Sequence, residues 1–521
     1  METGTESDRV HALSLVSQFG ERMTAILSAN ILLSAFLVFL CYLLHVRYNT
    51  ALRAVPGPLL ASFTRLWKVK TILTARQELV LLELHRKHGK SHLVRIGPNE
   101  ISVSDPGALK VIYGAGTKFT KTSWYPSWSM GGQSGKYDVF SDPTTEGHAA
   151  SKRMVSHSYS MAAVNELDLF VQRPVDRLLQ RFGEHTDGGT PMNLADWLQW
   201  FAFDVIGEVS FSKQFGFLDA GKDIDDTLKA IDETLWSGIV IAELPELDRI
   251  RKSSLFKYLP VVGGYDQRLN IIIGQAQQVL SERRRGREVD RRDLLSRFFQ
   301  VQRENPGKFD DLDLQVTITV NIFAGSDTTS IALRAILYYA ITNPRCYDKL
   351  LLELDEAVRS GRISKQTTLA EAQSLPYLQA CIKEAMRLHP SLGTQHTRYV
   401  PEGGVVLAGT YLPARTTVGI NSWVMHSQTA IFGPDADQYR PERWIDGDKS
   451  LMDRHFMSFG YGAHMCLGKN IALLEINKVI PQILLHYHLR LAHPEDGGWS
   501  CTSHTFVQQR KFHVIVERRK Q

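Results

Sequence analysis

The chain has 521 residues, of which 43% are hydrophobic and 22% charged, enough for one large folded unit or several ordinary domains. Its 60 Lys and Arg residues exceed its 55 Asp and Glu residues only slightly. This small excess is spread along the chain, so it argues against a nucleic-acid-binding protein. The five cysteines are widely scattered and odd in number, so they argue against a disulfide framework and favour a reducing compartment.

An apolar run near the amino terminus predicts a membrane anchor. Residues 25–44 carry no charged side chain, and as a helix they would span about 30 Å, the thickness of a bilayer's hydrocarbon core. A cleaved signal peptide is the alternative, but its apolar stretch usually has about 7–15 residues. Arg47 and Arg53 follow the run, so we expect the rest of the chain to face the cytosol. Residues 1–24 are then an N-terminal tail, and residues 45–58 are a basic, proline-containing linker.

The remaining residues, 59–521, predict one mainly α-helical domain with a smaller β-rich part. Most of this stretch has helical spacing of apolar residues, with short loops between the helices. Alternating and β-branched residues predict strands in three places, which are Leu93–Val103, Thr397–Ile420 and Thr505–Val516. No internal repeat or low-complexity tract breaks this pattern.

The strongest chemical signal is a cysteine within a glycine-rich segment. Phe459–Gly468 reads FGYGAHMCLG, with three glycines around Cys466. Glycines let the backbone pass close to a flat ligand and leave the sulfur free to project. The next stretch, Lys469–His486, predicts a helix whose dipole, together with a metal charge, would favour the thiolate. A lone cysteine is more often a buried structural residue in a glycine turn, which is the alternative here.

A second signal is a polar cluster inside a predicted buried helix. The helical pattern runs from about Asp313 to Thr342 and contains Ala324–Thr329, which reads AGSDTT. A glycine in a helix costs about 1 kcal/mol, and Ser and Thr can bond to upstream carbonyls and open the helix slightly. An acid and an alcohol in such a groove suit proton delivery away from bulk water. A helix–helix packing site is the alternative.

A third signal is the pair Glu384 and Arg387 within the predicted helix Pro376–Leu388. The i, i+3 spacing places acid and base on one helix face. Most pairs of this kind are surface pairs that contribute little, so the pair acquires meaning only from its position before Cys466. The segment Tyr439–Trp444, which reads YRPERW, lies between the two.

The ten-residue window around Cys466 resembles the haem-binding loop of the cytochrome P-450 family, Phe-x-x-Gly-x-(His/Arg)-x-Cys-x-Gly. In that family the cysteine is the proximal thiolate ligand of haem b iron and helps cleave the O–O bond. The resemblance implies that Cys466 is the metal ligand here. It rests on five matching positions at the family's spacing: Phe459, Gly462, His464, Cys466 and Gly468.

The same resemblance gives roles to the other two signals. The AGSDTT segment is similar to the distal-helix motif Ala-Gly-x-(Asp/Glu)-Thr, which implies that Asp327 and Thr328 are the catalytic acid and alcohol beside bound oxygen. Glu384 and Arg387 match the Glu-x-x-Arg helix, and Arg443 lies in a segment similar to Pro-Glu-Arg-aromatic. The family places these three residues in a buried triad whose role is structural.

Further haem contacts follow from the resemblance. Arg398 and His464 stand where the family places partners of the haem propionates. The third site departs from the family, because His148 is followed four residues later by Lys152 where an arginine is usual, with Arg153 next. Lysine can pair with a propionate only as a point charge, without the fork of arginine. The predicted cofactor-binding set is Cys466, His464, Arg398, Lys152, Arg153, His148, Phe459, Gly460, Gly468 and Ala324.

The resemblance also implies a substrate pocket, although each of its residues could instead be ordinary core. The matching positions are aromatic, aliphatic or small, with no acid or base near them except Asp327. Such a pocket favours a neutral, lipophilic molecule, and small residues would leave room above the iron for a bulky skeleton. The predicted pocket residues are Trp124, Trp128, Met130, Phe323, Ala324, Leu392, Gly393, Thr394 and Phe506.

Residues 95–100 and 120–125 resemble filamentous-fungal members of the family, including the pisatin-demethylase-like group. This likeness implies a single-pass enzyme of the endoplasmic reticulum membrane that oxidises secondary metabolites. It would receive electrons from NADPH through the flavins of cytochrome P-450 reductase, with cytochrome b5 as an optional second donor. Detoxification by the same chemistry is an alternative setting. A haem-thiolate isomerase or dehydratase would not need Asp327 and Thr328, and a non-enzymatic haem sensor has no positive support in the sequence.

Overall fold

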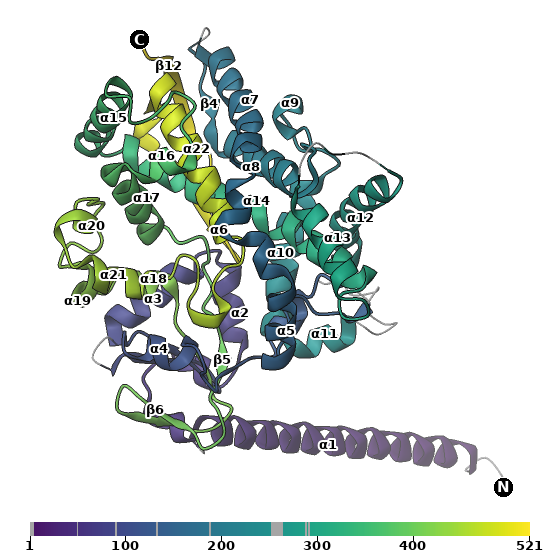
Figure 1. The fold of residues 1–521 in the computed structure, drawn as a ribbon. Helices are drawn as coiled ribbons and strands as arrows, with labels where there is room; N and C mark the ends of the chain where they lie inside the picture. The colour runs from purple at the N-terminus through teal and green to yellow at the C-terminus, as the bar shows by residue number, and fades with distance from the viewer. Residues whose placement is uncertain are drawn as a thin grey trace.

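The computed structural model describes residues 5–48, 50–88, 91–131, 134–186, 189–251, 264–286, 289 and 292–520. Helices make up most of it, and the small β-sheets lie in separate places (Figure 1). The predicted fold class, mainly α with a smaller β-rich part, is confirmed. The helices are α1 (Thr5–Tyr48), α2 (Leu66–Leu73), α3 (Gln77–His88), α4 (Ala108–Tyr113), α5 (Thr145–Val155), α6 (Met161–Asn165), α7 (Asp168–Thr186), α8 (Leu194–Phe211), α9 (Phe217–Ala220), α10 (Thr227–Glu243), α11 (Pro245–Arg251), α12 (Tyr265–Arg284), α13 (Leu294–Glu304), α14 (Asp311–Ile341), α15 (Pro344–Arg359), α16 (Leu369–Gln373), α17 (Pro376–Leu388), α18 (Ser422–His426), α19 (Thr429–Phe432), α20 (Arg443–Asp446), α21 (Lys449–His455) and α22 (Lys469–His486).

The helical part is built around α14, which has 31 residues and packs against α8, α12, α17 and α22 (Figure 1). Its start is fixed by a capping box, in which the Asp310 side chain accepts from the Asp313 amide and the Asp313 side chain accepts from the Asp310 amide. Its middle is buried in the largest hydrophobic cluster of the protein. The predicted helix was Asp313–Thr342, so the prediction is confirmed to within two residues.

The β-rich part joins segments that are far apart in the sequence. A five-stranded sheet has the order β1-β2-β8-β5-β3, and β2 and β8 are its parallel pair. All three predicted β segments contain strands, but short strands such as β3 and β4 were not predicted. The strands are β1 (Leu93–Gly97), β2 (Glu100–Val103), β3 (Thr120–Lys121), β4 (Met192–Asn193), β5 (Arg398–Tyr399), β6 (Val405–Leu407), β7 (Thr410–Leu412), β8 (Thr417–Gly419), β9 (Tyr487–Leu491), β10 (Ser500–Ser503), β11 (Val507–Arg510) and β12 (His513–Arg518).

The amino-terminal helix α1 is longer than the predicted anchor. It has 44 residues and a length of about 66 Å, so it also includes most of the predicted tail. By length and composition, Leu13–Tyr48 is a candidate membrane span, and Figure 1 shows α1 projecting beyond the body of the protein. The tail is therefore helical from Thr5 on, because no proline or glycine pair separates it from the apolar run.

The predicted linker is packed against the β-rich part. The Arg95 amide on β1 donates to the Pro56 oxygen at 2.7 Å. The buried Arg95 guanidinium also donates to the Val46 and Arg47 oxygens at the end of α1, each at 3.3 Å. A Cβ atom added to Gly57 would lie 2.1 Å from the Arg95 oxygen. The proline segment is therefore a closely packed connection between α1 and β1.

This packing predicts that Gly57→Ala lowers the free energy of unfolding by about 1–3 kcal/mol, because the added methyl group must displace backbone. Urea unfolding followed by tryptophan fluorescence measures the change. Gly274→Ala in α12 is the matched control, because a Cβ atom there meets nothing within 4 Å. The control should be neutral or slightly stabilising. Equal stability of the two variants would contradict a close-fitting joint.

Candidate active site

Cys466 lies at the end of a tight loop that only glycine permits. The Cys466 amide donates to the Phe459 oxygen at 2.8 Å, which closes the loop on itself. Gly460 and Gly462 have positive φ angles of 76° and 62°, and a Cβ atom on Gly462 would lie 1.9 Å from the Tyr113 oxygen. The predicted helix follows directly as α22, with Gly468 at its N-cap. The glycines therefore fix the loop shape, as their spacing predicted.

The Cys466 thiol has an environment unlike that of the two buried cysteines, Cys346 and Cys381, because its side chain is exposed. It nevertheless lies deep enough for desolvation to raise its pKa. The backbone amides of Gly468 and Lys469 act in the opposite direction and lower the pKa, as do the charges of Lys152 and Lys469. The helix start therefore supports the thiolate as predicted, but a metal charge is needed to complete the stabilisation.

The predicted acid and alcohol on α14 point into different surroundings. The Thr328 hydroxyl donates to the Ala324 oxygen one turn earlier at 3.0 Å, which is the upstream bond expected of a threonine in a helix. Ala324 is exposed although most of its neighbours in α14 are buried. Asp327 is only 1% exposed and accepts from the Gln199 amide at 2.6 Å and the Gln508 amide at 3.3 Å.

Burial and, to a smaller extent, the nearby Asp232 charge raise the pKa of Asp327 to about 6. Arg334 and Arg510 act in the opposite direction. The Gln508 amide also donates to Asp232 at 2.8 Å, so one side chain bridges the two acids. Asp327 therefore exchanges its proton close to neutral pH, which is what a proton donor needs.

The structure brings the predicted triad together on one carboxylate. Glu384 accepts from Arg387 at 2.8 and 2.9 Å and from Arg443 at 2.7 Å, and all three side chains are at most 1% exposed. The Trp444 indole also donates to Glu384 at 2.9 Å, and Arg443 pairs with Asp435 at 3.0 Å. Both arginines are thus fully paired, as a buried charge requires.

Several of the predicted cationic residues gather beside the cysteine loop. The Lys152 ammonium donates to the Ala463 oxygen at 2.5 Å, and the His148 ring lies 4.1 Å from the His464 ring. Arg398 is 1% exposed and donates to the Tyr125 hydroxyl at 2.5 Å. Arg153, by contrast, is exposed on α5.

Comparison with known proteins agrees with this arrangement. The sequence model of the family described as cytochrome P-450 matches residues 56–513. The chain belongs to the cytochrome P-450 family. It is 34% identical to the cytochrome P-450 monooxygenase cicH of Emericella nidulans over 493 residues, which cover 93% of this chain and 97% of that protein. It is 33% identical to a pisatin demethylase of Fusarium vanettenii over 483 residues, covering 92% of each. A cytochrome P-450 monooxygenase of Aspergillus terreus is 33% identical over 462 residues, covering 86% of this chain and 93% of that protein.

Membership of the cytochrome P-450 family makes the protein an oxygen-incorporating oxidoreductase and implies a haem-thiolate iron cofactor. The residues present fit such a group. Three nitrogen atoms beside the cysteine loop are buried without a hydrogen-bond partner: Nε of Arg398, Nδ1 of His464 and Nε2 of His396. Burial and the Arg398 charge lower the pKa of His464 to about 2. Unpaired buried nitrogens and a buried cation are what two carboxylates of a haem would satisfy.

The predicted pocket residues fall into two groups. Trp124, Trp128 and Met130 are buried in the segment that packs against α10, and the two indole rings lie 5.4 Å apart. Leu392 forms an isolated bridge with Phe506, near buried Thr394. Phe323 is buried on α14. Segments 124–130 and 392–394 meet at Glu243, because Thr394 and Glu243 line one cavity and the Trp124 indole donates to Glu243.

Gly393 is closely packed, because a Cβ atom there would lie 2.3 Å from the Ser503 hydroxyl of β10. One expectation about the pocket is wrong. The surroundings are not free of charge, because the Trp124 indole donates to Glu243 at 3.0 Å and Lys68 pairs with Glu243 at 2.8 Å and Glu100 at 2.7 Å. The sequence did not show this, because the end of α10 lies far from Trp124 along the chain.

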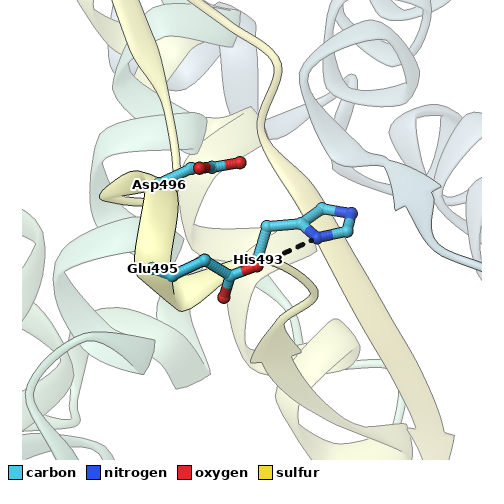
Figure 2. A group of neighbouring side chains, drawn as sticks. All are labelled: His493, Glu495 and Asp496. Atoms are coloured by element: carbon cyan, nitrogen blue, oxygen red, sulfur yellow. Dashed lines mark ion pairs between the residues drawn. The ribbon is translucent and has the colours of Figure 1, made fainter.

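Some residues that contact the site side chains belong to no recognisable sequence motif. Gln199 and Gln508 hold Asp327 from α8 and β11, and glutamine at those positions follows no motif. Trp444 could have been found, since it is the aromatic residue after Arg443. A surface group of His493, Glu495 and Asp496 has the composition of a metal site, but all three are exposed and His493 simply pairs with Glu495 at 3.5 Å (Figure 2).

The triad predicts that Glu384→Ala is severely destabilising, because it leaves two buried guanidinium groups without their carboxylate. The expected loss is roughly 3–5 kcal/mol of unfolding free energy, and protein of low haem content. Asp453→Ala is the control, since it breaks a partly exposed ion pair with Lys383 and should cost less than about 1 kcal/mol. Haem content and urea unfolding measure both effects. A stable, haem-loaded Glu384→Ala protein would contradict the structural role.

Proposed function

We propose that this monooxygenase binds haem b through Cys466 and uses O2 and electrons from NADPH to oxidise a neutral, lipophilic small molecule. The observation that carries the proposal is the cysteine loop itself. Its glycines fix the backbone, two amides at the start of α22 act against the burial that raises the pKa of the thiol, and buried nitrogens without a hydrogen-bond partner lie beside it. Neither a structural cysteine nor a simple glycine turn needs these three features together.

The bound haem would supply oxygen activation, and the residues of this chain would supply position and protons. Arg398, His464 and Lys152 hold the haem carboxylates, with His148 behind them. Phe459, Gly460, Gly468 and Ala324 shape the two faces of the cofactor space. Thr328 presents its hydroxyl oxygen on the distal side, and Asp327 holds and returns a proton at its carboxylate.

The substrate we propose is a neutral multi-ring compound, oxidised by hydroxylation or a related step in fungal secondary metabolism. Trp124, Trp128, Phe323, Leu392 and Phe506 offer apolar contact to such a molecule. The name of one relative, pisatin demethylase, supports action on a small molecule. The polar cluster of Glu243 and Lys68 adds a place for a substrate hydroxyl. Detoxification of lipophilic compounds would use the same site, whereas an isomerase or dehydratase would leave Asp327 and Thr328 without a role.

We further propose that residues 25–44 anchor the protein in the endoplasmic reticulum membrane, with residues 45–58 as the joint and 59–521 as the catalytic domain in the cytosol. The apolar length of α1 and the arginines after it support this topology. An NADPH–cytochrome P-450 reductase in the same membrane would deliver electrons through its flavins, with cytochrome b5 as an optional donor. Lys152 contacts the cysteine loop, Lys469 follows it directly, and Arg153 is exposed next to Lys152 on α5, so these charges would attract an acidic flavoprotein.

The iron ligand is tested by Cys466→Ala, which should abolish the red-shifted Soret band of the reduced carbonyl complex. Cys501→Ala is the matched control and should leave the band in place, because Cys501 lies on β10. Absorption spectra of both proteins decide the matter. A normal band in the Cys466 variant would overturn the proposed function.

The proposed role of the Thr328 hydroxyl is tested by Thr328→Ala. This variant should keep haem binding but divert electrons to peroxide. Product formed per NADPH consumed should fall by at least about tenfold with a compound that shifts the haem spectrum on binding. Thr317→Ala is the control, because its hydroxyl makes the same bond to a carbonyl one turn earlier in α14, at 2.7 Å from Asp313. Unchanged product yield in the Thr328 variant would show that another group positions the proton.

The raised pKa of Asp327, about 6, predicts a pH dependence. The carboxyl is protonated below this pKa and ionised above it, so product per NADPH should decline as pH rises through about 6. Asp327→Asn removes the titrating group and should give a lower yield without that decline. The yield measured between about pH 5 and pH 8 is the test. A decline that persists in Asp327→Asn would belong to a different group.

A further inference from the structure

A small cavity lies between α2, the carboxyl end of α10 and the segment before β5. Thr394 and Gln395 line it from that segment, Lys68 lines it from α2, and Glu243 lines it from α10. Its free space is about that of one water molecule, so it admits a small substituent and not a ring. The cavity is therefore a place where one functional group of a larger molecule fits.

The donors of the polar cluster beside this cavity are already used. The Lys68 ammonium pairs with Glu100 at 2.7 Å and with Glu243 at 2.8 Å. The Trp124 indole donates to Glu243 at 3.0 Å, and the Gln395 amide nitrogen donates to Glu100 at 2.9 Å. Burial lowers the pKa of Lys68, but the two glutamates raise it above its ordinary value, so the ammonium stays charged. The cluster thus contains one cation that is shared between two anions.

One acceptor at the cavity has no partner. Gln395 is 4% exposed, and its Oε1 is buried without a hydrogen bond to any part of the chain that the structure describes. The amide cannot be reversed, because its oxygen would then face the Glu100 carboxylate. Its position is also fixed, since a Cβ atom added to Gly419 of β8 would lie 3.0 Å from the Gln395 side chain. A buried acceptor left unpaired is destabilising, so this oxygen would gain from a donor.

The segment that carries Gln395 starts beside the proposed oxygen-binding site. The Ser391 hydroxyl donates to the Thr328 backbone oxygen on α14 at 3.1 Å. Gln395 follows Ser391 by four positions, which is at most about 14 Å of extended chain. Leu392 and Thr394, two of the predicted pocket residues, lie between them. A molecule of several rings is therefore long enough to reach from the cavity to Thr328.

We propose that the cavity is a subsite for a hydroxyl group of the substrate, which donates to Oε1 of Gln395. The proposal rests on the proposed function and narrows it. The substrate is a multi-ring alcohol or phenol, and it is oxidised at the end of the skeleton remote from that hydroxyl. A methyl ether cannot donate and is larger, so it fits less well. An ammonium also fits less well, because the unpaired acceptor is a neutral amide oxygen that cannot offset the desolvation of a charge.

The test uses the full chain loaded with haemin and imidazole probes that the iron itself holds, so it needs no known substrate. Each probe is a biphenylmethyl imidazole that carries a hydroxyl, methoxy, aminomethyl or hydrogen substituent at the para position of the far ring. Gln395→Met removes the acceptor at similar side-chain size. Gln180→Met on α7 is the matched control, since Gln180 also donates its amide to a glutamate, Glu184 at 3.3 Å, but is exposed. Titration of the Soret band shift gives the dissociation constant of each probe.

We expect the parent to bind the hydroxyl probe about fivefold tighter than the unsubstituted and methoxy probes, which is the usual effect of one buried hydrogen bond. Gln395→Met should lose this preference and keep the parent's affinity for the unsubstituted probe. Gln180→Met should match the parent with all four probes.

Equal binding of the hydroxyl and unsubstituted probes by the parent would overturn the proposal. Tightest binding of the aminomethyl probe would also overturn it, because the cavity would then be a cation site. A hydroxyl preference that persists in Gln395→Met would show that another group accepts the hydroxyl. If Gln395→Met fails to retain haem, the parent's ranking of the four probes decides alone. A parent chain that binds no haemin, or shows no Soret shift with any probe, would instead overturn the proposed function itself.

Discussion

One buried carboxylate, that of Glu384, fixes the position of much of the site. It binds Arg387 on its own helix and Arg443 on α20, so α17 and the segment before α20 cannot move apart without exposing unpaired charge. Arg387 also fixes His426, because the Arg387 backbone oxygen lies 2.9 Å from Nδ1 of His426. Nε2 of His426 accepts from the Met457 amide at 2.8 Å, and Met457 leads into the cysteine loop. His426 is thus a core residue that connects the triad to the loop of Cys466.

Charge is balanced in the scaffold and unbalanced where the family's cofactor would lie. The triad pairs its arginines with Glu384 and Asp435, and the buried Lys68 pairs with two glutamates. Asp327, by contrast, is held mainly by neutral amides, while Arg398 and Lys121 are buried with neutral partners. A buried charge with neutral partners titrates easily or seeks a counter-ion, which are the two properties that proton delivery and cofactor binding require.

The features predicted most accurately are those that depend on motifs of consecutive residues. Helices α17 and α22 have the bounds that were predicted, because proline starts one and the glycine-rich cysteine loop precedes the other. The shape of the cysteine loop and the triad could also be predicted from the sequence, since each depends on residue types at fixed spacing. The surroundings of Asp327 and Trp124 were not, because Gln199, Gln508 and Glu243 reach them from distant elements that carry no motif.

The strand order of the five-stranded sheet has a consequence for biosynthesis. β1, β2 and β3 are made early, but their partners β5 and β8 belong to the last quarter of the chain. Long-range pairing of this kind is slow, because the ends of a very large loop must meet before any contact rewards the loss of entropy. Until β5 and β8 are made, the nascent chain has an unpaired sheet edge and lacks Arg398 and Cys466. Haem capture, as proposed above, would follow the synthesis of these segments, so we expect chaperone supply and haem supply at that stage to limit yield in a heterologous host.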